Sequence, residues 1–280
     1  MKKPRLRHIA AQWTMLGYPS PEKELSLDEK MAAAKKAGFD GFAFYIPDPL
    51  LPSLGKKHGL QICGYIGSGN VKEFPKLLQL NKDCGAHHIN VQMADEDTLT
   101  PEALGMAILL LQEGKRIGVE PAIEVHRDTC TETPEKAYAL AEAYQKVTGE
   151  LLPMTWDFSH LSVVKHLNPT NYIEKLILRP DLIQRAQQFH FRPFNGHHAQ
   201  VPVTDGRGNL TNEVKDWLPF AEAVLKCWLE GNQNTDREIF VCPELGPVPG
   251  GYNLSSLPNS WEDAQVLRLE IEKIWTKLNV

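Results

Sequence analysis

The sequence alternates short apolar runs with amphipathic stretches from one end to the other, and this constrains its fold more than any other feature. A short apolar run bounded by turn residues is typical of a buried strand, and a longer amphipathic stretch is typical of a helix. Strands that alternate with helices predict a parallel sheet with crossover helices. We therefore expect an α/β protein.

About eight strand–helix units fit into the 280 residues. A (β/α)8 barrel uses roughly 250 residues, or about 31 for each unit. We see no linker, low-complexity stretch or second core, so the sequence predicts a single (β/α)8 TIM barrel over residues 1–280. The eight predicted strands are the segments 7–16, 39–46, 60–67, 87–93, 119–126, 154–160, 186–194 and 238–245.

Helix starts are marked by capping residues. Ser26 and Glu29 have the spacing of a capping box, in which each side chain bonds the backbone of the other residue. Thr100 and Thr133 are each followed by Pro-Glu, which predicts a threonine N-cap with proline at the first helical position. The closing segment 260–278 is amphipathic, and we expect it to cover the outside of the barrel.

Composition narrows the partners and the compartment. A net charge of −5 gives no basic surface for a nucleic acid, and no apolar run is long enough to cross a membrane. The basic N-terminus lacks a secretory apolar core, and the five scattered cysteines lack CxxC spacing. We expect reduced thiols and a cytoplasmic protein. The apolar stripe of segment 260–278 serves barrel coverage or a contact between two copies equally well, so a homo-oligomer stays open.

Four potential metal ligands stand at the ends of the last four predicted strands: Glu124, Asp157, His190 and Glu244. Glu124 and Asp157 are 33 residues apart, and so are Asp157 and His190. The longer last interval contains an extra loop. The carboxyl ends of the strands of a parallel barrel meet at one face, where these side chains would converge.

Each of these residues alone would be explained as a helix cap or a salt-bridge partner. Together, three carboxylates and an imidazole in one cup would carry a heavy desolvation penalty without a cation. Oxygen-rich ligation with one imidazole suits a divalent ion such as Mn²⁺, Mg²⁺, Co²⁺ or Zn²⁺. The sequence therefore predicts a site for one divalent metal ion.

The order Glu, Asp, His, Glu on strands five to eight resembles the xylose isomerase-like TIM barrels, which include ketose 3-epimerases, dehydratases and AP endonucleases. The resemblance implies that Glu124 and Glu244 bind the metal and also exchange protons with the substrate. It implies that Asp157 and His190 are ligands only. The expected substrate is a small ketose, aldose or related polyol, isomerised or epimerised by proton transfer through a metal-stabilised enediolate.

Neighbouring residues extend the resemblance to substrate binding. Asp157 and His160 are similar to the Asp-x-x-His of the family, and Arg192 follows His190 as an arginine that reaches substrate oxygens does there. His126 and His197 occupy loops in which the family has histidines. The resemblance therefore implies four substrate contacts besides the metal ligands: His160, Arg192, His126 and His197. Gln92, Trp13 and Trp156 are interpreted as packing residues, and His87 and His88 as structural residues of the opposite barrel face.

Two members of the group are disfavoured, and two alternatives stay open. The additional metal-binding histidines of the AP endonucleases are absent, as is the lysine that true xylose isomerases have after strand five. A metal-dependent dehydratase of the inosose or dehydroshikimate type would use the same single-metal site. A barrel that binds a sugar without turning it over would keep the ligands as well.

Overall fold

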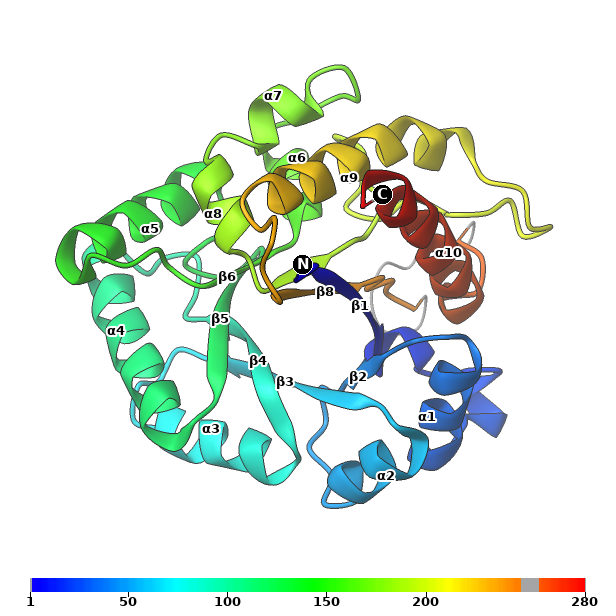
Figure 1. Ribbon diagram of the computed structural model, residues 1–280, viewed down its shortest axis with the longest axis horizontal. Helices are drawn as coiled ribbons and strands as arrows, with labels where there is room; N and C mark the ends of the chain where they lie inside the picture. The colour runs from blue at the N-terminus through cyan, green and yellow to red at the C-terminus, as the bar shows by residue number, and fades with distance from the viewer. Residues whose placement is uncertain (1, 248–256, 280) are drawn as a thin grey trace.

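A computed structural model describes residues 2–247 and 257–279. Its eight strands form one closed parallel barrel in the order of the chain, and β1 pairs with β8 to complete it. Figure 1 looks into this barrel and shows the helices arranged around the outside of the strands. The (β/α)8 TIM-barrel prediction is confirmed. The strands are β1 (Arg5–Ala11), β2 (Gly41–Ala43), β3 (Gln61–Ser68), β4 (Ala86–Met93), β5 (Glu120–Val125), β6 (Met154–Trp156), β7 (Gln188–His190) and β8 (Glu238–Cys242).

The helices follow the strands in sequence and differ widely in length. Two short 3-10 turns, Trp13–Met15 and Pro21–Lys23, come after β1. The α-helices are α1 (Leu27–Lys36), α2 (Leu51–His58), α3 (Phe74–Asp83), α4 (Thr100–Ile117), α5 (Pro134–Thr148), α6 (Phe158–Val164), α7 (Tyr172–Leu176), α8 (Pro180–Arg185), α9 (Asn212–Glu230) and α10 (Ser260–Leu278). Among the described residues, no helix is both long and apolar enough to cross a membrane.

The predicted helix caps are found at two positions of three. Ser26 and Glu29 form both hydrogen bonds of a capping box at the start of α1. The Thr133 side chain accepts a hydrogen bond from the backbone N–H of Lys136 at the start of α5. The prediction for Thr100 is wrong, because Leu99 takes the N-cap position of α4 and Thr100 is already helical.

Five of the predicted strand segments extend well beyond the strands that form, namely those of β1, β2, β6, β7 and β8, and two of these lie at the candidate site. The predicted segment 154–160 is a strand only as far as Trp156, because the Asp157 side chain caps α6 by accepting from the backbone N–H of Ser159. The predicted segment 186–194 is a strand only from Gln188 to His190. As a result, the candidate metal ligands Asp157 and His190 lie at the ends of β6 and β7.

The closing helix α10 packs against the barrel within a single chain, as expected from its pattern. Its apolar stripe is buried in this contact and consists of Trp261, Leu267, Ile271, Ile274 and Trp275. Its Asp263 carboxylate accepts from the backbone N–H of Val203 at 2.8 Å and from the hydroxyl of Thr204 at 2.7 Å. The helix therefore also holds the long loop between β7 and α9. All five cysteines are buried and free.

Candidate metal centre

Four side chains from four consecutive strand ends meet at the carboxyl-terminal mouth of the barrel. Glu124 lies in β5, Asp157 directly follows β6, His190 ends β7 and Glu244 lies two residues beyond β8. One potential ligand atom from each lies within 4.8 Å of the others. Glu124 and Asp157 are fully buried, His190 is 4% exposed, and the Glu244 side chain is 18% exposed. The cluster is closed on the barrel side and open towards solvent only at Glu244.

His190 lies between the two glutamates. Its Nδ1 is 2.7 Å from Glu124 Oε1 and 3.2 Å from Glu244 Oε2. Burial alone would raise the pKa of Glu124 and lower that of His190, but their mutual attraction outweighs it. The pKa of Glu124 is lowered to about 2, and that of His190 is raised well above its usual range. The centre is therefore built to hold positive charge between two carboxylates.

The donor set fits a divalent cation. Glu124 Oε1 and His190 Nδ1 are both buried, yet neither has a hydrogen-bond partner with acceptable geometry among the described residues. Buried polar atoms without a partner are uncommon in folded proteins, and an ion that binds both atoms would satisfy them. Three carboxylates with one imidazole suit a hard or borderline divalent ion. These four residues could therefore hold a metal ion.

The Asp157 carboxylate is also in contact with two buried side chains outside the cluster, Arg192 and His160. The Arg192 guanidinium forms an ion pair with Asp157 Oδ2, and its Nε donates to Ser159 Oγ at 3.2 Å. His160 Nε2 lies 3.3 Å from the same carboxylate oxygen. Although burial opposes ionisation, the positive charge of Arg192 holds the pKa of Asp157 well below its usual range. Arg192 thus fixes an ionised carboxylate at the edge of the cluster.

Glu124 is oriented by two amides that the sequence interpretation did not include in the site. Asn90 Nδ2 and Gln92 Nε2 donate to Glu124 Oε2 at 2.6 and 2.9 Å, and Tyr65 donates its hydroxyl proton to Gln92 Oε1 at 2.8 Å. Two amides on one oxygen leave Oε1 available to a ligand. Asn90 and Gln92 are two apart in β4, so they point to the same side of the strand, and this polar alternation was the available signal.

A cavity of about 290 Å³ opens above the cluster, which suits a small molecule. His126 and Arg192 line it together with Glu244, and Trp13 is also in its wall, whereas Trp156 is buried in the core. His160 is buried and does not line the cavity, although its ring lies 4.2 Å from that of His126. His197 is exposed on the following loop and is absent from the cavity wall. The structure thus brings two of the four expected substrate contacts to the cavity.

Several solved structures have the same fold as this barrel. An L-ribulose 3-epimerase superposes with a TM-score of 0.64 at 13% identity, covering 97% of this chain and 96% of that one. A xylose isomerase-like TIM-barrel protein of Mycobacterium smegmatis in complex with magnesium gives a TM-score of 0.59 at 14% identity, with 97% of each chain covered. The chain has the xylose isomerase-like TIM-barrel fold. A probable 3-DHS dehydratase of Bacillus anthracis shares it, with a TM-score of 0.57, 14% identity and coverage of 98% and 99%.

The sequence itself carries no such match. No protein-family model matches the chain, and no curated protein matches it either. The xylose isomerase-like fold is therefore recognised from the three-dimensional arrangement, at identities of 13–14% in the structures named above.

Proposed function

We propose that the protein is a divalent-metal-dependent isomerase or epimerase of a small ketose, aldose or related polyol. The observation that carries the proposal is the cluster of Glu124, Asp157, His190 and Glu244, whose ligand atoms converge beneath a cavity of small-molecule size. The fold shared with an L-ribulose 3-epimerase supports the sugar as substrate class. Mn²⁺, Mg²⁺, Co²⁺ and Zn²⁺ all remain candidate ions.

The two glutamates are the proposed acid and base. When bound, a divalent cation supplies Lewis acidity towards adjacent oxygens of a hydroxy-ketone. Glu244 lines the cavity and is partly exposed, so its carboxylate can remove a proton from the carbon beside the carbonyl. Glu124 is the proposed group that exchanges a proton at the other side of that carbon, and Asn90 and Gln92 hold its carboxylate in place.

Other cavity residues are proposed to bind rather than to transfer protons. Tyr65 lines the cavity, but burial and then the charges of Glu124 and Glu244 raise its pKa to about 12. A hydroxyl that stays protonated serves as a hydrogen-bond donor and not as a base. His126 and Arg192 are the proposed substrate contacts, because both are in the cavity wall. The cytoplasm is the proposed compartment, supported by five free cysteines.

The test follows solvent deuterium into the substrate. Protein loaded with Mn²⁺ is incubated in D₂O with a panel of small ketoses, and deuterium at the carbon beside the carbonyl is measured by mass spectrometry and NMR. We expect uptake with the wild type and loss of uptake with Glu244→Gln, which removes the base at nearly constant volume. Glu120→Gln, which changes an exposed glutamate at the start of β5, is the matched control.

The products separate the alternatives. A product that has lost one water would establish a dehydratase on the same site, as in the 3-DHS dehydratase of this fold. Sugar binding with neither exchange nor elimination would leave a non-catalytic sugar-binding barrel. Full deuterium exchange in Glu244→Gln would refute the proposed role of that glutamate.

A further inference from the structure

A chain of three polar side chains crosses the interior of the barrel and ends at the candidate metal centre. His88 Nε2 lies 2.7 Å from Gln188 Oε1, and Gln188 Nε2 lies 2.7 Å from His190 Nε2. All three side chains are nearly inaccessible, with exposures of 3% for His88, 1% for Gln188 and 4% for His190. His190 thus has one nitrogen in the ligand cluster and the other against an amide.

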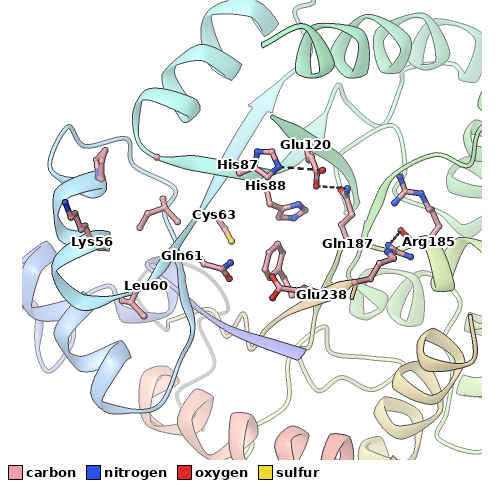
Figure 2. A pocket seen from close by; sticks show the side chains of 16 residues that line it. Lys56, Leu60, Gln61, Cys63, His87, His88, Glu120, Arg185, Gln187 and Glu238 are labelled. Atoms are coloured by element: carbon pink, nitrogen blue, oxygen red, sulfur yellow. Dashed lines mark hydrogen bonds and ion pairs between the residues drawn. The ribbon is translucent and has the colours of Figure 1, made fainter. Parts of the chain in front are cut away.

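The two ends of this chain face different cavities. His190 lines the cavity above the metal centre, whereas His88 lines a cavity of about 630 Å³ at the opposite, amino-terminal mouth of the barrel. Figure 2 shows His88 among the side chains of that lower cavity, with Glu120 paired to His87 and Gln187 nearby. His88 Nδ1 is itself buried and has no hydrogen-bond partner among the described residues.

The direction of the hydrogen bonds along this chain is restricted by valence. A cation can bind His190 Nδ1 only through its lone pair, so the neutral ring must carry its proton on Nε2. The neighbour of Nε2 must then accept a hydrogen bond. The side chain of Gln188 has one acceptor, Oε1, and its nitrogen can only donate. An amide has nearly the same shape either way round, so Oε1 can take the place of Nε2 at 2.7 Å from His190 Nε2.

We propose that Gln188 is a positioning residue for the metal centre, and that its amide presents Oε1 to His190 Nε2–H when a divalent cation is bound. This inference rests on the proposed metal-dependent function. In this arrangement Gln188 Nε2 donates to His88 Nε2, and His88 carries its own proton on Nδ1. Every bond of the chain then has one donor and one acceptor.

His88 is suited to this role because it can accept. Burial lowers the pKa of His88 to about 4, although its bond to Gln188 opposes the shift. The ring is therefore neutral, and a neutral imidazole can carry its proton on either nitrogen. Partners that fix the tautomer of a ligating histidine typically change metal affinity by about 10- to 100-fold when they are removed.

The test measures metal affinity and not turnover. Purified metal-free wild type, Gln188→Met and Gln188→Glu are titrated with Mn²⁺ in a calorimeter. Met keeps the shape of Gln without its hydrogen bonds, so we expect the Mn²⁺ affinity to fall by about 10- to 100-fold. Glu offers only acceptors to His190, so affinity at or above that of the wild type is expected. Gln187→Met, at the lower cavity, is the matched control and should bind as the wild type does.

A spectroscopic measurement keeps the inference open to refutation if Gln188→Met does not fold. With Zn²⁺ bound to wild type, imidazole ¹H–¹⁵N correlations should show His190 protonated at Nε2 and coordinated through Nδ1. Coordination through Nε2 would overturn the inference, and so would unchanged Mn²⁺ affinity in a folded Gln188→Met. The proposed function would survive either result. A wild type that binds neither ion would remove the proposed function and this inference together.

Discussion

His190 Nδ1 and Glu124 Oε1 lie 2.7 Å apart in the closed floor of the barrel mouth, and neither atom has an acceptable hydrogen bond among the described residues. Two polar atoms in that relationship are satisfied together by a single ion between them. The stability of the whole protein should therefore depend on whether the ion is bound.

Divalent metal is expected to stabilise the fold. A ligand that binds only the native state adds about 2.7 kcal/mol at a concentration 100 times its Kd. We expect Mn²⁺ to raise the free energy of unfolding by this order, EDTA to reverse the gain, and His190→Ala to abolish it. Urea unfolding with and without Mn²⁺ is the measurement, and His87→Ala, at the other barrel mouth, should keep the full gain. Equal stabilisation of His190→Ala would place the ion elsewhere.

Removal of an amide from Glu124 should destabilise the protein. Asn90 donates to Glu124 Oε2 at 2.6 Å in a buried environment, and hydrogen bonds to charged groups contribute about 1.5–3 kcal/mol. We expect Asn90→Leu, which has nearly the same shape, to lower the free energy of urea unfolding by about 2 kcal/mol without metal. An unchanged unfolding midpoint would show that Gln92 alone suffices to hold this carboxylate.

Acid should destabilise the fold through His88. Its folded-state pKa of about 4 lies below the ordinary value of 6.5, so the unfolded chain takes up the proton first as the pH falls. The stability tied to neutral His88 is thus complete above pH 6.5 and decreases towards pH 4, by about 3 kcal/mol. Urea unfolding of wild type and His88→Gln across this range should show a shallower loss in the variant. Parallel profiles would contradict the shift.

Two threonines in the same Thr-Pro-Glu motif should respond differently to substitution. Thr133 caps α5 through the backbone N–H of Lys136 at 3.2 Å, whereas Thr100 makes no capping bond to α4. We expect Thr133→Ala to lower the free energy of unfolding by about 1 kcal/mol and Thr100→Ala to change it little. Chemical denaturation of the two variants is the comparison. Equal losses would mean that the motif acts through something other than capping.

Most of the fold could be predicted from the sequence because its signals are local. The capping box of Ser26 and Glu29 and the amphipathic pattern of segment 260–278 fall where the structure has them. Local patterns were weaker at the short strands. Residues 157–160 were predicted to continue the sixth strand, but the Asp157 carboxylate accepts a hydrogen bond from the backbone N–H two residues on and caps a helix instead. Likewise Leu99, not Thr100, precedes the first turn of α4.

The site was only partly predictable because its contacts join distant strands. Regular spacing identified the four convergent residues, since each strand–helix unit returns the chain to the same face. The partners of Glu124 are inward-facing amides of β4, and Gln188, which lies against His190 on β7, is itself bonded to His88 of β4. Their pairing depends on barrel register, which spacing along the chain does not reveal. His197 looked equivalent to other loop histidines, but its loop carries it outside the cavity wall.

The buried ion pair of Arg192 and Asp157 has a consequence for which ions the centre can accept. With His190 neutral, three carboxylates and one guanidinium leave two negative charges in the barrel mouth. A potassium or sodium ion would leave one of these unbalanced, and a ferric or aluminium ion would introduce a surplus positive charge. Either imbalance is expensive where most of the charged groups are buried. Arg192 would therefore set the ionic valence of the centre, while the ligand atoms set its preference among ions of that valence.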